Sequence, residues 1–470
     1  MPAAKVQNAR AIFEAYTSHN SGHRIHTDTN IQIALHEHYP SHNISSTTTD
    51  LIKFAHAGNA SAIPDTTKHQ TLQSLAFEPA ARRLNDSKNA GKLKSVVSFG
   101  LYDYAWQEHD FQVFVVDGQN SLHSMCDCRY YILAPKASAD AENHDEDFKD
   151  SSIEAMEALV LEASAWAQQT HEEFWIYDQG RWTKDAELYS LVQDINWDDL
   201  ILQEKTKQAI LRDVTGFFDA RDTYRELGTP WKRGLIFHGL PGNGKTSTAK
   251  ALMKSLTSRP EPVPTLVVKT LSQRGFGPQM SLRQIFAKAR QAAPCLLLFE
   301  DIDSLVTEEV RSYFFNEVDG LEDNGGILMV GSTNSSTDTP RAQVENLHPG
   351  LSKRPSRFDR KYHFDNPSLE ERTRYCEYWK RKLSNKPAAE MPDRLPPYIA
   401  SITEGFSFAY MKEAYVGSLL TLARQSGDSE IPSLPEPSDE QVQTKGRFGI
   451  ILEQQVASLR EDIGEAATHQ

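Results

Sequence analysis

Eight consecutive residues, 239–246, restrict the fold of this 470-residue chain more than any other segment. They read GLPGNGKT and fit the pattern G-x-x-x-x-G-K-[ST]. Glycines at these positions let the backbone curl, so that successive N–H groups face inward and can cradle phosphate at the start of a helix. The lysine of the pattern reaches the terminal phosphates, and the hydroxyl residue ligates Mg²⁺. This glycine-rich loop therefore predicts a site for a nucleoside triphosphate.

The sequence on both sides of the glycine-rich loop provides the setting that such a loop requires. Residues 234–238 (GLIFH) are typical of a buried parallel strand, and residues 247–254 have the spacing of a helix. An ordinary glycine-rich turn is the alternative, but it leaves the coincidence of strand, loop and helix unexplained. The residues predicted to contact the nucleotide here are Gly239, Leu240, Pro241, Gly242, Asn243, Gly244, Lys245, Thr246 and Ser247.

Carboxylates follow a second apolar run. Residues 295–299 (CLLLF) indicate a strand buried on both faces, and Glu300, Asp301 and Asp303 come directly after it. Ligands bind beyond the carboxyl ends of the strands in open parallel sheets, so these acids are expected beside the nucleotide. One carboxylate would fix Mg²⁺ or its water, and a neighbour would polarise the attacking water. Taken alone, acids after a strand are as often a solvated turn or a helix cap.

Further along the chain, an amide and two guanidinium groups occupy positions suited to the same chemistry. Asn334 follows the apolar run 327–330, where it could donate to the γ-phosphate and position water. A turn-initiating Asn is the alternative. Arg357 and Arg360 precede a short predicted strand at 362–364, and their fixed charge suits arginine fingers supplied to a neighbouring subunit's phosphate. A solvated basic loop is the alternative.

In this order and spacing, the motifs resemble those of the AAA ATPase family. The resemblance covers residues 195–425, and the segment 316–360 corresponds to the family's second region of homology. Within the family, the sequence is most similar to the mitochondrial Rieske-protein-translocating ATPases and to a group of uncharacterised fungal and bacterial AAA proteins. Residues 224–234 (YRELGTPWKRG) and 405–410 (GFSFAY) carry this closer likeness. We expect no membrane anchor of the mitochondrial type here, so its particular task is not transferred.

The resemblance assigns roles to the phosphate-side residues. It implies that Lys245 and Thr246 hold phosphate and Mg²⁺, that Glu300 stands where the metal-side acid is usual, and that Asp301 stands where the catalytic base is usual. This order is inverted relative to the common Asp-Glu. Because Asp is one methylene shorter than Glu, the question of which acid acts as the base stays open.

The resemblance also assigns roles to residues farther from the phosphates. Asn334 corresponds to the sensor residue, and Arg357 and Arg360 correspond to the two fingers donated across a subunit boundary. Asp199 and Ile201 match the segment that lines adenine. The resemblance therefore implies ATP and Mg²⁺ as cofactors and a homo-oligomeric ring, normally a hexamer.

The implied fold class is α/β: a P-loop AAA module, with a parallel sheet flanked by helices and a small helical lid, preceded by a small α+β amino-terminal domain. The apolar segment 72–77 suggests a short helix. The predicted divisions are a mostly helical or irregular region at 1–94, a small α+β domain at 95–190, a large α/β ATPase subdomain at 195–365, a helical lid at 366–425, and a linker with a carboxyl-terminal helix at 426–470.

Composition restricts the possible binding partners and the cellular location of the protein. A formal net charge of −14 argues against broad nucleic-acid or anionic-membrane binding, so no nucleic-acid partner is expected. No run approaches the roughly 18 apolar residues that a spanning helix needs, so no integral membrane segment is expected. Residues 1–20 lack the apolar core of a secretory signal, and four cysteines are too few for a disulfide framework. We therefore expect an intracellular protein, cytoplasmic or nuclear, with an organelle left open.

Two functional classes follow from these observations. The favoured one is a ring that hydrolyses ATP to remodel or disassemble protein substrates in a chaperone-like manner; its rival is a nucleotide-gated scaffold or adaptor with slow or no hydrolysis. Many AAA rings grip polypeptide with an aromatic residue after the second strand, and Phe276, between two glycines, fits either such a grip or a plain flexible turn. A DNA motor is disfavoured by the acidic charge.

Overall fold

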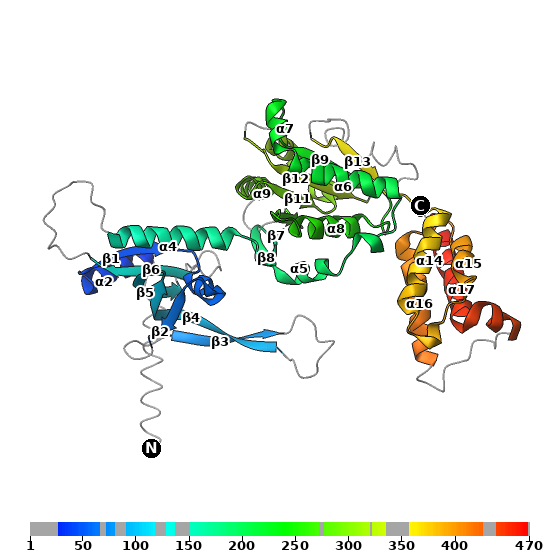
Figure 1. Cartoon of the computed structure of the whole chain (residues 1–470), viewed down its shortest axis with the longest axis horizontal. Helices are drawn as coiled ribbons and strands as arrows, with labels where there is room; N and C mark the ends of the chain where they lie inside the picture. Colours follow the sequence, from blue (N-terminus) through cyan, green and yellow to red (C-terminus); the bar gives the residue numbers. More distant parts are fainter. Residues whose placement is uncertain are drawn as a thin grey trace, which may run out of the picture. The chain divides into compact units, whose positions relative to one another are not determined.

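The computed structural model describes residues 27–65, 72–79, 91–117, 128–136, 151–271, 277–319, 322–334, 357–425 and 439–468. The chain divides into two compact units, Met1–Gln169 and Thr170–Gln470, and each has its own sheet (Figure 1). Phe276, proposed to grip substrate, lies outside the described residues.

A six-stranded antiparallel sheet forms the first unit, in the order β1-β6-β5-β4-β2, with β3 paired to another part of β4. Helix α4 (Ser151–Gln168) packs on one face of this sheet and α2 (Thr27–His38) on the other. The alternation along β5 explains the two faces, because Val113 joins the core under α4 while Phe114 joins the core under α2. The strands are β1 (His42–Thr47), β2 (Ser61–Pro64), β3 (Leu72–Pro79), β4 (Gly91–Trp106), β5 (His109–Asp117) and β6 (Cys128–Pro135), and the short helices α3 (Leu51–Phe54) and η1 (Ala55–Asn59) join β1 to β2.

The structure corrects two expectations for this unit. Residues 72–77, predicted to be helical, lie in β3, where Leu75 and Phe77 alternate with small or polar residues at the period of a strand. A division between residues 94 and 95 is also wrong, because β4 runs through it and β1 pairs with β6. Long-range strand pairing, which a local pattern does not show, therefore joins both predicted regions into one sheet.

A seven-stranded sheet forms the centre of the second unit, in the order β13-β9-β12-β11-β10-β7-β8. Strand β8 runs antiparallel to β7, and the other neighbouring pairs are parallel. Alternate residues of β11 enter opposite cores, with Leu298 on one face and Phe299 on the other, which explains its continuous apolar run. The strands are β7 (Phe174–Asp178), β8 (Arg181–Asp185), β9 (Arg233–His238), β10 (Thr265–Val268), β11 (Cys295–Phe299), β12 (Ile327–Thr333) and β13 (Arg360–His363).

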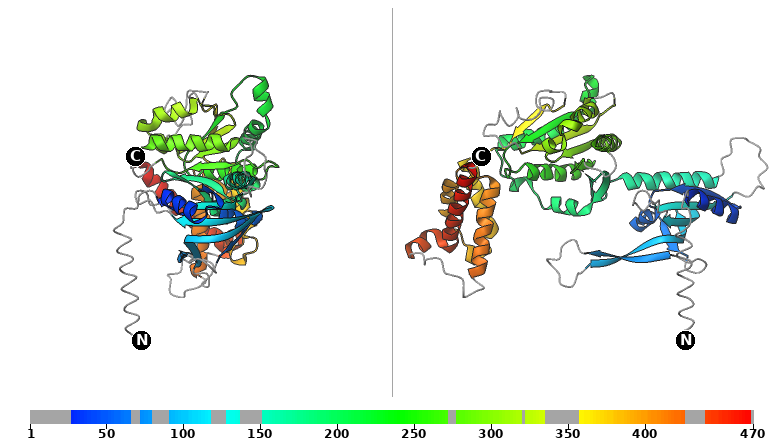
Figure 2. Two further views of the ribbon diagram at one scale, coloured as in Figure 1. Left: turned by 90° about the vertical axis from the view of Figure 1, so that its left-hand side faces the viewer. Right: turned by 180° about the vertical axis from the view of Figure 1, so that it is seen from behind.

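Helices cover both faces of this sheet (Figure 2). Helices α5 (Ala186–Gln193), α6 (Glu204–Asp219) and α8 (Lys245–Thr257) contribute to one core, and α9 (Pro278–Ala292) and α11 (Glu308–Asp319) contribute to the other. Shorter elements are η2 (Trp197–Asp199), α7 (Arg221–Glu226) and α10 (Ile302–Leu305). The predicted α/β class, with a parallel sheet between helices, is confirmed.

Residues 170–190 belong to the second unit, with β7 and β8 in its sheet, and not to the amino-terminal domain in which they were predicted. Strand β7 pairs in parallel with β10, and the Lys269 N–H donates to the Tyr177 carbonyl at 3.0 Å. The Tyr177 side chain is fully buried in the core.

A helical lid follows, formed within the described residues by α14 (Leu369–Leu383), the short η3 (Pro387–Ala389), α15 (Leu395–Ile402), α16 (Phe408–Gln425) and α17 (Asp439–Thr468). Its core contains a stacked pair, Trp379 and Tyr415, with ring centroids 4.9 Å apart. Phe448 and Leu452 of α17 pack into the same core, so this last helix belongs to the lid. Among the described helices, none combines the length and the apolar character that crossing a bilayer requires.

Candidate active site

The glycine-rich loop connects β9 to α8, as predicted. Gly239, Gly242 and Gly244 have φ values of 146°, 84° and 93°, which residues other than glycine rarely adopt. A Cβ at Gly239 would lie 2.1 Å from the Phe364 carbonyl oxygen. Gly244, as the N-cap of α8, has no side chain to accept from the first N–H groups of that helix. These donors and the helix dipole suit a phosphate group.

Lys245 supplies a cation inside the loop. Its side chain is 5% exposed, and Nζ donates to the carbonyl oxygens of Gly239 and Leu240, each at 2.8 Å. Burial lowers the pKa of Lys245 to about 8, although the carboxylates of Asp301 and Asp303 act in the opposite direction. The ammonium group is therefore within electrostatic reach of the acids that follow β11, which is the juxtaposition predicted from the sequence.

Asp301 and Asn334 meet at the carboxyl ends of adjacent strands. Strand β11 pairs in parallel with β12, and Asn334 Nδ2 donates to Asp301 Oδ1 at 2.6 Å. The Asp301 N–H donates to Ser332 Oγ at 3.1 Å. Asp301 has left-handed backbone angles, φ 52° and ψ 57°, a conformation that is uncommon outside glycine and that clusters at functional sites. Glu300, which precedes it, is half-buried at the end of β11.

A cavity of about 330 Å³ lies against the loop. It brings together eight of the residues predicted from the sequence: Asp199, Ile201, Gly242, Gly244, Lys245, Thr246, Ser247 and Asn334. The predicted residues Gly239, Leu240, Pro241 and Asn243 belong to the loop, and Glu300 and Asp301 follow β11, without lining this cavity. The cavity is large enough to be the site of a small ligand.

Sequence reasoning missed Tyr375 and Lys412, which line the cavity from the helical lid. The rings of Tyr375 and Phe408 lie 5.2 Å apart, and burial raises the pKa of Tyr375 to about 12, so that its phenol stays neutral. Phe408 and Lys412 are four residues apart on α16 and so share one face. That spacing was the available signal, but it does not show which cavity the face lines.

The two predicted finger arginines are held within their own chain. Arg357 is 6% exposed; its Nε donates to Asp319 Oδ2 at 2.5 Å, and its guanidinium lies 3.6 Å from the centroid of the Phe315 ring. Arg360 is 55% exposed and pairs with Asp213 at 3.2 Å. In this structure, therefore, Arg357 is buried and Arg360 carries an intramolecular ion pair, so action in a neighbouring site stays a prediction.

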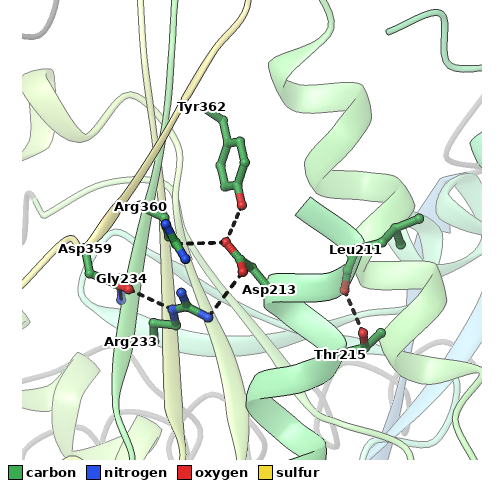
Figure 3. Close-up of polar contacts among 8 residues, drawn as sticks. All are labelled: Leu211, Asp213, Thr215, Arg233, Gly234, Asp359, Arg360 and Tyr362. Carbon is green, nitrogen blue, oxygen red and sulfur yellow. Dashed lines mark hydrogen bonds and ion pairs between the residues drawn. The ribbon is translucent and has the colours of Figure 1, made fainter. Parts of the chain in front are cut away.

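The carboxylate of Asp213, on α6, contacts other side chains besides Arg360 (Figure 3). Arg233, at the start of β9, lies 3.5 Å from the same carboxylate and also donates to Asp359 at 2.8 Å. The Tyr362 hydroxyl donates to Asp213 as well. This Asp213 cluster joins α6 to the adjacent strands β9 and β13, at the strand ends opposite the glycine-rich loop.

Residues near the loop fit Mg²⁺ bound with a nucleotide. Mg²⁺ usually takes one or two oxygen ligands from protein and the rest from phosphates and water. Within the described residues no group of three or more His, Cys, Asp and Glu side chains is arranged to hold a metal ion. The hydroxyl of Thr246, which lines the cavity, and the carboxylate of Glu300 are oxygen donors of the required kind. These two residues would hold the ion together with the phosphates.

Comparison with known proteins gives one family match. Residues 235–366 match the model for "ATPase family associated with various cellular activities (AAA)". The chain is 30% identical over 231 residues to the cell division cycle protein 48 homolog of Archaeoglobus fulgidus. It is 26% identical over 239 residues to the ATPase family gene 2 protein of Saccharomyces cerevisiae, and 28% over 226 residues to the protein of that name in Schizosaccharomyces pombe.

These matches cover 46–47% of this chain and 26–29% of the relatives, so the chain spans less than a third of the proteins that it matches. They support an ATPase domain of the AAA type at residues 235–366, within the second unit. The closer likeness to the Rieske-protein-translocating type stays a prediction.

Proposed function

We propose that this chain, whose residues 235–366 are an AAA domain, binds Mg·ATP and hydrolyses it to ADP and phosphate. One observation carries the proposal: the buried ammonium of Lys245 and the Asp301–Asn334 pair share one edge of a parallel sheet, beside a cavity of about 330 Å³. Fixed donors and acids arranged in this way are what phosphoryl transfer to water needs.

The residues divide the work between binding and chemistry. The N–H groups at the start of α8 and the Lys245 ammonium hold the phosphates, and Thr246 and Glu300 hold Mg²⁺. When bound, Mg²⁺ neutralises charge that develops on the phosphate oxygens. Asp301 accepts a proton from the attacking water, and Asn334, which donates to Asp301 at 2.6 Å, orients this carboxylate.

The work that hydrolysis drives is also a proposal. Relatives with this domain are named as a cell division cycle protein 48 homolog and as ATPase family gene 2 proteins. By this likeness, we propose a homo-oligomeric ring, normally a hexamer, that remodels protein substrates inside the cell in a chaperone-like manner. The acidic net charge of −14 supports a protein rather than a nucleic-acid substrate.

A nucleotide-gated scaffold with slow or no hydrolysis is the second candidate. One observation favours it: Arg357 is buried against Asp319 and Phe315, and Arg360 is paired with Asp213. If these pairs persist in the assembled protein, neither arginine reaches a neighbouring phosphate, and hydrolysis lacks that stabilisation.

Phosphate release by the purified full chain, measured over a range of protein concentrations, separates the two candidates. A ring ATPase shows a specific activity that rises with concentration as subunits associate, together with a larger particle in sedimentation. A scaffold binds a fluorescent ATP analogue but releases no phosphate. Lys245→Ala should weaken nucleotide binding at least about 100-fold, because the buried cation that faces the phosphates is lost. Retained binding in Lys245→Ala would place the nucleotide elsewhere and refute both candidates.

A further inference from the structure

Strand β3 and the first half of β4 form a two-stranded ribbon that extends from the sheet of the first unit (Figure 1). Residues 91–99 of β4 pair with β3, whereas residues 99–106 pair with β5. Residues 72–77 of β3 are all exposed, and neither core described for this unit includes them. Along this stretch β3 therefore pairs with β4 but does not pack on the cores of its own unit.

One face of this β3–β4 ribbon is apolar. Phe77 lies directly opposite Leu93, and Leu75 precedes Phe77 by two residues on the same strand. Residues two apart in a strand share a face. The side chains of Leu75, Phe77 and Leu93 are 67%, 60% and 65% exposed. Together they present on the order of a few hundred Å² of apolar surface, the size of the largest patch on a typical monomer, and such patches often have a function.

The ribbon also has two free edges. Within the described residues, β3 pairs only with β4, and residues 91–98 of β4 pair only with β3. Residues 72–77 read LQSLAF and contain no charged residue or proline, which are the usual means by which an edge strand avoids pairing with another chain. A two-stranded ribbon is only marginally stable alone, and a third strand stabilises it. The edge of β3 is therefore suited to accept a further strand.

The size and the pattern of the apolar face indicate which partner fits it. A stable interface with a second copy of the chain would bury about 800 Å² on each partner, which is more than this face offers. A lipid surface offers no partners for the backbone N–H and C=O groups of a free edge. An extended polypeptide offers both kinds of contact, because its backbone can pair with β3 and its alternate side chains recur about every 6.8 Å, as those of Leu75 and Phe77 do.

We propose that the β3–β4 ribbon binds extended segments of unfolded protein by strand addition, and that it selects segments with apolar residues at alternate positions. The inference rests on the proposed function, because it names the class of protein segment that the remodelling activity would take. The added strand pairs with the free edge of β3, and its apolar side chains pack beside Leu75 and Phe77. The contact is small, so binding is weak and reversible, which suits a substrate that must be released.

Binding of a short fluorescent peptide that alternates valine with threonine, measured by anisotropy with the full chain and no nucleotide, tests the proposal. The double variant Leu75→Thr with Phe77→Thr keeps strand propensity but removes apolar surface, and it should bind the peptide at least about tenfold more weakly. Leu161→Gln, at a leucine that is 70% exposed on α4 of the same unit, is the matched control and should bind as the wild type does. Equal binding by the wild type and the double variant overturns the proposal.

A second peptide tests strand addition itself. N-methylation of alternate residues keeps every side chain but removes the N–H groups along one edge of the peptide. The wild type should bind this peptide at least about tenfold more weakly than the unmodified one, because the backbone hydrogen bonds to β3 are lost. Equal affinity for the two peptides would show that the ribbon does not bind by strand addition and would overturn the proposal.

Hydrogen exchange locates the bound peptide without any substitution, so the test does not depend on how the variants fold. The peptide should slow amide exchange at residues 72–77 and leave β1, another edge strand of the same sheet, unchanged. Protection of β1 in place of β3 overturns the proposal. Self-association of the wild type that the double variant loses, without peptide binding by either, would assign the face to a second copy and also overturn it.

The failure of this inference and the failure of the proposed function give different results, because peptide binding is measured without nucleotide. A wild type that releases phosphate but does not bind the peptide overturns the ribbon proposal alone. A wild type that binds the peptide at β3 but neither binds nor hydrolyses ATP overturns the proposed function and supports the ribbon as a binding surface.

Discussion

Two aspartates at opposite ends of the same sheet show how differently one side chain can be used. Asp301 follows the carboxyl end of β11, is exposed, and accepts a side-chain hydrogen bond from Asn334 at 2.6 Å. Asp213 lies on α6 near the amino ends of β9 and β13, and its side chain is only 12% exposed. Its carboxylate forms ion pairs with the guanidinium groups of Arg233 and Arg360 and accepts a hydrogen bond from the Tyr362 hydroxyl (Figure 3).

The difference lies in how fully each carboxylate is neutralised. Two guanidinium groups and a phenol already contact the Asp213 carboxylate, so its role is to join a helix to two strands. The Asp301 carboxylate is exposed, accepts a hydrogen bond from Asn334, which lines the cavity, and acts electrostatically on Lys245. We therefore expect Asp301 to serve the reaction and Asp213 to stabilise the fold. A substitution at Asp301 should lower turnover, and a substitution at Asp213 should lower the free energy of unfolding.

The largest effect should come from Asp301→Asn. Turnover should fall about 10²–10⁴-fold, because an amide cannot accept the proton of the attacking water. Nucleotide affinity and the unfolding temperature should change little, since the amide retains an acceptor oxygen for Asn334. Phosphate release, binding of a fluorescent nucleotide and thermal unfolding of the same sample check the three expectations.

Glu300→Gln is the matched control for this substitution. If Glu300 serves Mg²⁺, its loss should weaken Mg·ATP binding and should be relieved in part by higher Mg²⁺. Normal turnover in Asp301→Asn together with lost turnover in Glu300→Gln would reverse the two roles.

Asp213→Ala should have the opposite profile. Arg233, whose side chain is 16% exposed, would keep Asp359 but lose its second carboxylate, and Arg360 would lose its partner. The unfolding free energy should fall by about 2–3 kcal/mol, as is typical when one member of a largely buried charged network is removed. Nucleotide binding per folded molecule should remain. Loss of nucleotide binding without loss of stability would show that the Asp213 cluster serves the site after all.

The two aspartates also show what a sequence can predict. Strand β9, the glycine-rich loop, α8, and the Glu300–Asp301 pair were predicted because each signal is local: a run, a loop pattern, and acids directly after a strand. The contacts of Asp213 were not predicted, because Arg360 and Tyr362 follow it by well over a hundred residues. The pairing of β13 with β9 brings them to Asp213. Tyr375 and Lys412 were missed for the same reason, since the lid brings them to the cavity.

Strand β7 illustrates the limit most clearly. The apolar run at residues 174–177 is typical of a strand, yet nothing within the run indicates that its partner is β10, about ninety residues later. Domain boundaries depend on such pairings, so the predicted division near residue 190 was placed too late.

A smaller effect is expected from pH, through Lys245. Burial lowers the pKa of its ammonium group to about 8. The group is therefore charged below this pH and neutral above it, and nucleotide that requires the cation should bind less tightly as pH rises through 8. Between pH 7 and pH 9 the dissociation constant should increase about tenfold. Titration calorimetry at a series of pH values measures it, and Asp213→Ala should follow the same profile, because its cluster takes no part in binding.

Tyr362→Phe should give the smallest effect and the finest test of the Asp213 cluster. The Tyr362 side chain is 9% exposed, and its hydroxyl donates to a carboxylate that keeps both arginines after the substitution. Burial and the nearby Asp213 charge raise the pKa of Tyr362, so the phenol is neutral and the bond is worth about 1 kcal/mol. For a unit of this size the unfolding temperature should fall by about 2 °C. Tyr313→Phe, at a tyrosine that is 47% exposed, is the control and should leave the unfolding temperature unchanged. An unchanged unfolding temperature in Tyr362→Phe would mean that the arginines alone neutralise Asp213. An equal drop of about 2 °C in the control would mean that the effect does not come from the bond to Asp213.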